Sequence, residues 1–121
     1  MATYSKLNLS QSTNGRSIMV SASAAPYTLI HTTSISATNT DEIWLYAANR
    51  STADTLLTLY WGSSATDDLL APIVIQAYAG TTLLIPGLIL NGTGSAGSTI
   101  YATVAIPSAV EVVGYVNRIT A

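Results

Sequence analysis

The only histidine of the chain, His31, is the first residue to consider for catalysis. A Ser-His-Asp triad needs a histidine beside a serine that is held on a sharp turn, and the chain contains no G-x-S-x-G sequence to build that turn. A zinc site of three or four protein ligands is not expected either, because cysteine is absent and carboxylates are few. His31 is therefore predicted to be an ordinary strand residue. The sequence predicts no catalytic residue, no metal ligand and no enzyme.

Residues 92–97, Gly-Thr-Gly-Ser-Ala-Gly, match the G-x-G-x-x-G pattern of dinucleotide-binding proteins. In those proteins a helix begins within the pattern, and its N-terminus holds the pyrophosphate. Here a β-type sequence follows at 98–104, with Pro107 close behind it. The segment is therefore predicted to be a flexible hairpin loop, and no cofactor is expected.

Four of the six acidic residues occur as the adjacent pairs Asp41-Glu42 and Asp67-Asp68. Adjacent residues of a strand point to opposite faces, so neither pair is arranged for acid–base catalysis. Solvated acids in turns are the favoured interpretation. Calcium binding together with backbone oxygens is the alternative.

The aromatic residues Trp44, Tyr46, Tyr60 and Trp61 flank one predicted hairpin. Core packing and interface contacts are the commoner uses of such residues, and a carbohydrate platform is the alternative. Sugar binding would expose Trp44 or Trp61 on a concave face. Assembly would place them inside the protein or at subunit contacts.

Charge is scarce in this chain of 121 residues, which is the length of one domain. Charged residues make up 8% of it, against about 25% in ordinary globular domains. The net charge of -2 excludes a basic nucleic-acid footprint, and a hydrophobic content of 49% excludes disorder. Residues 69–90 are apolar, but prolines and glycines divide them into runs too short for a membrane-spanning helix. Neither a signal peptide nor membrane association is expected.

Short β-type runs bounded by turn residues recur along the chain. About eight strands at regular spacing predict an all-β fold, a single β-sandwich that is jelly-roll-like or immunoglobulin-like. The predicted strands are 17–23, 27–35, 42–49, 55–61, 70–76, 81–90, 98–105 and 110–119.

Soluble monomers protect sheet edges with charged side chains, above all lysine. This chain has a single lysine, Lys6, which lies outside these eight strands. Apolar strands such as 70–75 would be prone to aggregation as open edges, so loops or other subunits must cover them. Other subunits are the favoured cover, which predicts a self-assembling structural protein. A lone sandwich coated with serine and threonine is the alternative.

Residues 1–16 are polar and are predicted to form an extended N-terminal arm, with the sandwich domain at 17–121. Leu7 and Leu9 alternate with polar neighbours as in a short strand, and such an arm is long enough to reach an adjacent subunit. A loosely ordered terminus is the alternative. The predicted assembly contacts are the anchors Tyr4, Leu7 and Leu9, with Lys6 and Arg16 available to acids on the partner.

Three stretches resemble small β-sandwich virion proteins of tailed bacteriophages: 54–62 (DTLLTLYWG), 82–90 (TLLIPGLIL) and 99–116. The resemblance implies a structural protein of the virion, foremost a capsid decoration (cement) protein at the capsid surface. It would work as a symmetric homo-oligomer, such as a trimer, bound to a major capsid protein or another virion protein. The alternatives are a neck, tail, baseplate or fibre component, or a carbohydrate-binding β-sandwich module.

Overall fold

A computed structural model describes residues 2–63 and 69–120, and within them the chain forms strands, turns and loops without a helix. That part of the chain therefore contains no helix able to cross a membrane. The strands are β1 (Thr3–Asn8), β2 (Ile18–Met19), β3 (Thr28–Thr32), β4 (Thr40–Asn49), β5 (Thr55–Gly62), β6 (Leu69–Ile75), β7 (Thr82–Asn91), β8 (Thr99–Val104) and β9 (Val110–Thr120).

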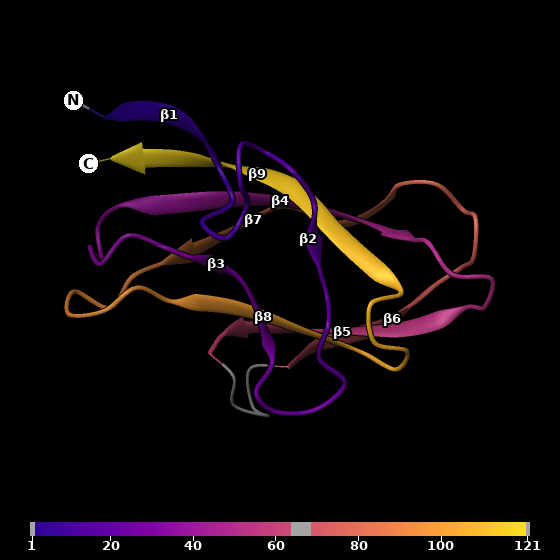
Figure 1. Ribbon diagram of the computed structural model, residues 1–121. Helices are drawn as coiled ribbons and strands as arrows, with labels where there is room; N and C mark the ends of the chain where they lie inside the picture. Colours follow the sequence, from indigo (N-terminus) through magenta and orange to yellow (C-terminus); the bar gives the residue numbers. More distant parts are fainter. Residues whose placement is uncertain (1, 64–68, 121) are drawn as a thin grey trace.

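The strands form two antiparallel sheets that pack face to face, so the predicted β-sandwich is confirmed (Figure 1). One sheet has the order β1-β9-β4-β7, with β2 also paired to β9, and the other has the order β3-β8-β5-β6. From β3 onward the chain changes sheet at every connection except the β5–β6 hairpin. Residues distant in the sequence therefore meet across the sandwich, and the two chain ends lie side by side on β1 and β9.

Alternation of side chains decides what each strand buries. In β4, Ile43 and Leu45 are fully buried between the sheets, whereas Trp44 and Tyr46 are partly exposed on the outer face. The core collects such inward residues from both sheets, among them Ile30, Leu57, Leu59, Ile100, Val112 and Val116. β4 therefore has apolar residues on both of its faces. One set packs in the core, and the other lies on the outer surface of the sheet.

All eight predicted strands are present, with shifted ends; β2 is the most shortened, at 18–19 instead of 17–23. The ninth, β1, lies in the segment predicted to leave the sandwich as an arm. In the single chain β1 pairs with β9 of the same chain, from Thr3↔Thr120 to Asn8↔Tyr115, and an arm that reaches another subunit stays a prediction. Burial of Leu9 in the core and the hydrogen bonds offered by the edge of β9 hold the segment in place.

The sheet edges are β1 and β7 in one sheet, and β3 and β6 in the other. The apolar strands β6 and β7 are thus edge strands, and lysine guards only β1, through Lys6. Other devices protect the rest. Proline occurs in β6 at Pro72 and in β7 at Pro86, and the pairing of β7 with β4 and of β3 with β8 contains register shifts. These features oppose simple edge-to-edge pairing.

Candidate functional site

A buried polar cluster joins the two sheets at the end of the sandwich that carries both chain termini. It consists of His31 on β3, Asp41 on β4 and Arg118 on β9, together with the backbone of Ser10 just after β1. Arg118 forms two hydrogen bonds with Asp41, from Nε to Oδ1 at 2.7 Å and from Nη2 to Oδ2 at 2.9 Å. His31 and Asp41 are each 1% exposed, so this carboxylate is paired inside the protein.

The hydrogen bonds of His31 determine its tautomer. The Ser10 backbone N–H donates to His31 Nδ1 at 2.9 Å, so the ring proton lies on Nε2, which donates to Asp41 Oδ2 at 2.9 Å. The imidazole is therefore neutral, and both nitrogens are occupied. A base with neither nitrogen free, shielded from solvent, serves to position its neighbours.

The electrostatics of Asp41 follow from this arrangement. Burial by itself raises the pKa of a carboxyl group, but hydrogen bonds from Arg118 and His31 outweigh burial and lower the pKa of Asp41 from 3.8 to about 2. The prediction that Asp41 is a solvated turn acid is wrong. Its parity in β4 matches that of Ile43 and Leu45, and this signal in the sequence already pointed inward.

Sequence reasoning also missed Arg118, whose partner Asp41 lies 77 positions away. Within the described residues, no group of three or more histidine and acidic side chains could hold a metal ion. The pair Asp67-Asp68, considered above for calcium, lies outside the described residues. The cluster is thus a structural clasp that joins β3, β4, β9 and the residue after β1.

A second group of side chains crosses the outer face of the first sheet. Lys6 on β1 has Nζ 4.9 Å from the centroid of Tyr115 on β9, and Tyr115 stacks with Trp44 on β4 at 6.1 Å. Trp44 Nε1 donates to Glu42 Oε1 at 2.8 Å, and Asn117 Nδ2 donates to the same oxygen at 3.0 Å. These bonds, first that of Trp44 and then that of Asn117, lower the pKa of Glu42.

The two tryptophans therefore have partners within the chain. Trp44 lies against Tyr115 and against Gly87 of β7, where an added Cβ would come 2.9 Å from the indole. Trp61 packs against the core. Neither is the isolated exposed ring that a sugar platform needs.

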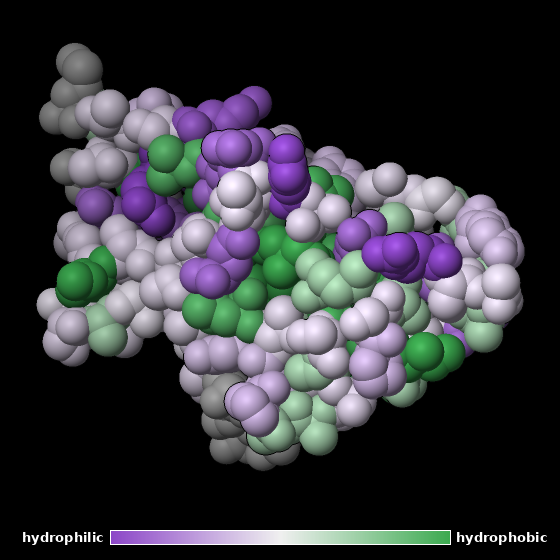
Figure 2. Space-filling model, viewed as in Figure 1, coloured by the Kyte–Doolittle hydropathy of each residue, from purple (hydrophilic) through white to green (hydrophobic). Residues whose placement is uncertain are grey.

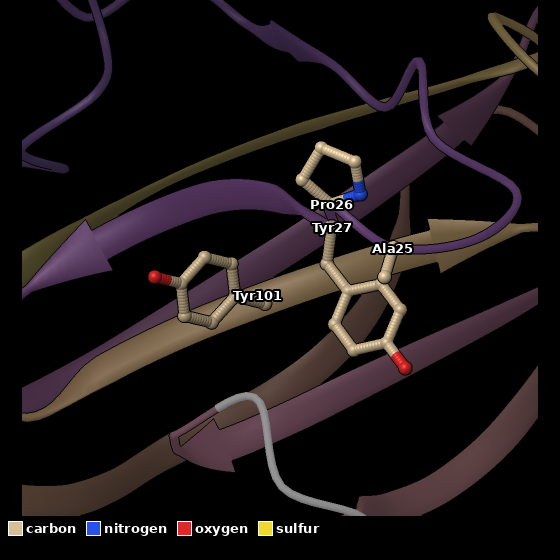
Figure 3. A pocket seen from close by; sticks show the side chains of 4 residues that line it. All are labelled: Ala25, Pro26, Tyr27 and Tyr101. Atoms are coloured by element: carbon tan, nitrogen blue, oxygen red, sulfur yellow. The ribbon is translucent and has the colours of Figure 1, made fainter.

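The outer side of the second sheet carries an open hollow of about 250 Å³. It is lined by Ala25, Pro26, Tyr27 and Tyr101, and Figure 3 shows the two tyrosine side chains lying on either side of the proline. Tyr27 also stacks on Tyr60 at 4.5 Å, and the pKa of Tyr60 is raised by its hydrogen bond with Tyr27 and by burial. The lining side chains carry no charge.

The glycine pattern at 92–97 forms the connection between β7 and β8, and a strand follows it instead of a helix. The prediction of a hairpin loop is wrong, because β7 and β8 lie in different sheets and the segment crosses between them. Its first and last glycines have a packing role. A Cβ on Gly92 would lie 2.1 Å from the backbone oxygen of Ser34, and a Cβ on Gly97 would lie 2.4 Å from that of Thr33. These glycines permit close approach of two backbones, which is a sufficient reason for their presence.

The five residues predicted for assembly lie in two different environments, the core of the chain and its surface. Leu9 is 1% exposed in the core and Leu7 packs against it, so both anchor β1 to its own chain. Tyr4 is 73% exposed, and Lys6 and Arg16 are also exposed. In the part of the chain that the structure describes, Lys6 and Arg16 form no ion pair. An assembly role for these three stays a prediction.

Exposed apolar side chains occur on β5 and β6 of the second sheet, on β7 of the first sheet, and on the turn between β6 and β7. They are Leu56, Val74, Tyr78, Leu83, Leu88 and Ile89, with exposed fractions from 41% to 76%. Figure 2 shows the face with β2 and β3 in front, where apolar residues also reach the surface beside the hydrophilic segment that follows β1. Exposed apolar side chains in such number are typical of an interaction surface.

Comparisons with known proteins do not assign the chain to a family. No family model and no curated protein matches it. One solved structure, described as "Bacillus endospore appendages form a novel family of disulfide-linked pili", aligns with 98% of this chain and 85% of its own. The TM-score is 0.46 and the identity 13%, values too low to support an argument about function.

Proposed function

We propose that this protein is a non-enzymatic structural protein that assembles with copies of itself. The observation that carries the proposal is the set of exposed apolar side chains on β5, β6 and β7, of which β6 and β7 lie in a stretch without an acidic or basic residue between Leu69 and Val110. Such a surface is stabilised by burial against another protein, at about 25 cal/mol per Å² of apolar area.

The arrangement of these side chains favours contact through faces. Leu56 and Val74 are direct cross-strand partners and are exposed together, at 41% and 58%. On β7, Leu83 and Ile89 are exposed at 48% and 60%, and they pair with Tyr46 and Glu42 of β4. Apolar side chains thus extend from the edge strands onto the outer sheet faces, where a second copy could cover them without disturbing the bulged backbone of β7.

The titratable groups support a structural role. His31, Asp41 and Arg118 satisfy one another and tie the sheets together. Glu42 is held by Trp44 and Asn117. Each of these groups has a partner that explains its position.

Light scattering on the purified chain tests self-assembly. The natural chain should be oligomeric at micromolar concentration, and Leu83→Lys and Ile89→Lys should shift it toward monomer because a buried lysine opposes association. Thr93→Lys adds the same charge on the exposed β7–β8 loop and serves as the matched control. A natural chain that is a soluble monomer, or a control that dissociates equally, would overturn the proposal.

Within this class, the resemblance in the sequence favours a virion protein, foremost a capsid decoration protein bound to a major capsid protein. A decoration protein needs a closed oligomer such as a trimer, whereas a tail or appendage component forms stacked rings or filaments. Electron microscopy of the assembled chain distinguishes them. Closed particles of uniform size support decoration, and open filaments contradict it while leaving self-assembly intact.

The hollow beside Tyr27 and Tyr101 favours a second candidate, a carbohydrate-binding module. Tyrosine rings and a proline without charge can stack against a sugar ring. Binding to a glycan array should then be lost in Tyr101→Ala and retained in Tyr78→Ala, which removes an exposed tyrosine elsewhere. Absence of binding by the natural chain would exclude this candidate.

A further inference from the structure

β1 is attached to the sandwich along one side only. It pairs with β9 over its whole length and forms the edge of its sheet. Five of its residues are exposed, and Leu7 is the exception. The strand therefore adds little to the core between the sheets, and its ladder with β9 and the residues just after it hold it in place.

The contacts after β1 form a compact latch. Leu9 lies in the core, the Ser10 N–H donates to His31, and the Thr32 N–H donates to Ser10 Oγ at 2.7 Å. Through His31 the latch reaches Asp41, so it is continuous with the buried clasp. Apart from the hydrogen bond that the Ser12 N–H donates to the Leu9 carbonyl, the contacts described for residues 3–10 come from β9, β3 and the core.

The connection from the latch to β2 bonds mainly to itself. The Ser12 N–H donates to the Leu9 carbonyl, the Arg16 N–H donates to the Thr13 carbonyl, and Ser12 Oγ donates to the Arg16 carbonyl at 2.6 Å. Asn14 and Gly15 have φ values of 56° and 83°, which fold the chain back on itself. Among residues with a side chain, asparagine tolerates this left-handed geometry best, so Asn14 and Gly15 suit the turn without marked strain.

We infer that residues 2–10 exchange between copies, with β1 of one chain pairing to β9 of a second. Every contact that holds the segment would form again in the second copy, including the Leu9 site and the Ser10 bond to His31. Extended, residues 11–17 span about 23 Å, at roughly 3.3 Å per residue, which is enough to reach an adjacent subunit. Only another copy carries a segment that matches this register and this latch.

Exchange converts contacts within a chain into contacts between chains, so it costs association entropy. Copies already held together by their apolar faces bear less of that cost, because their effective concentration is high. The inference therefore rests on the proposed self-assembly and adds the element that would link neighbouring subunits. It also gives the predicted N-terminal arm a partner, the β9 edge.

Tyr4 and Ile119 lie directly opposite each other in the ladder, and the chain has no natural cysteine, so a disulfide placed there reports the pairing. The variant Tyr4→Cys/Ile119→Cys is oxidised after assembly and then analysed on a denaturing, non-reducing gel. Exchange gives covalent oligomers. Closed pairing gives only covalent monomers, and that result overturns the inference.

Mixing two single variants tests the same contact between different chains. Tyr4→Cys chains mixed with Ile119→Cys chains should form a mixed disulfide dimer, identified by mass spectrometry. Tyr4→Cys mixed with Thr52→Cys should not, because Thr52 is exposed beyond the Asn49 end of β4, opposite the end that pairs with Ile119. Equal yields in the two mixtures would mean random collision and would also overturn the inference.

Light scattering on the same samples separates this inference from the proposed function. Oligomers that contain only covalent monomers reject exchange and leave self-assembly standing. Particles of monomer size reject both.

Discussion

Replacing Asp41 by asparagine tests whether the buried clasp stabilises the sandwich. Asp41→Asn keeps the size of the side chain but removes the charge that Arg118 compensates. Glu42→Gln is the matched control on the next residue of β4, since its side chain lies on the outer face and keeps an oxygen for Trp44 and Asn117. The comparison therefore isolates the two features that Asp41 has and Glu42 lacks, namely burial between the sheets and pairing with Arg118.

The magnitude follows from the pKa of Asp41, which folding lowers from 3.8 to about 2. One pKa unit corresponds to about 1.4 kcal/mol, so ionised Asp41 stabilises the fold by roughly 2.5 kcal/mol. Breaking a buried pair by removing one partner costs about 3–5 kcal/mol, and asparagine retains part of the hydrogen bonding. We expect Asp41→Asn to lower the free energy of unfolding by about 2–3 kcal/mol, which corresponds to a loss of roughly 10 °C in Tm.

Urea unfolding at pH 7, followed by far-ultraviolet circular dichroism, measures the difference at low protein concentration. Glu42→Gln should unfold at nearly the same urea concentration as the natural chain, and Asp41→Asn at a clearly lower one. Equal midpoints for the two variants would show that the clasp contributes nothing, and the reasoning from burial and pairing would be refuted.

Three further predictions concern pH, glycine packing and salt. Because the pKa of Asp41 is lowered on folding, its stabilisation is present above about pH 5 and decreases as pH falls toward 2; in an acid titration, the stability advantage of the natural chain over Asp41→Asn should vanish in that interval. Gly87→Ala should destabilise more than Gly94→Ala in thermal unfolding, since both have positive φ but only Gly87 places the new Cβ against Trp44; an equal loss would refute the packing argument. Assembly should persist from low to molar salt, because exposed ion pairs contribute at most about 1 kcal/mol each; dissociation by salt, seen in light scattering, would contradict an apolar interface.

The sequence by itself determined the fold class. Short β-type runs between turn residues predicted the all-β sandwich and the positions of eight strands, because strand formation depends on local sequence patterns. Alternation in β4 also contained the inward direction of Asp41, although it was interpreted as a turn acid. Local sequence also showed that the glycine loop at 92–97 is not a nucleotide-binding motif, because a β-type sequence follows it where such a motif requires a helix.

Only the tertiary structure decided which strands meet and what the buried charges do. The segment that contains β1 was predicted as an extended arm with the alternation of a short strand, but its pairing with β9 joins the two ends of the chain, and no local pattern specifies a partner at such separation. The clasp depends on the same long-range pairing, since β4 and β9 must be neighbours before Arg118 can reach Asp41. Hydrogen-bond ladders accept many partners, and burial of a whole core selects among them, so strand order and the clasp arise together on folding.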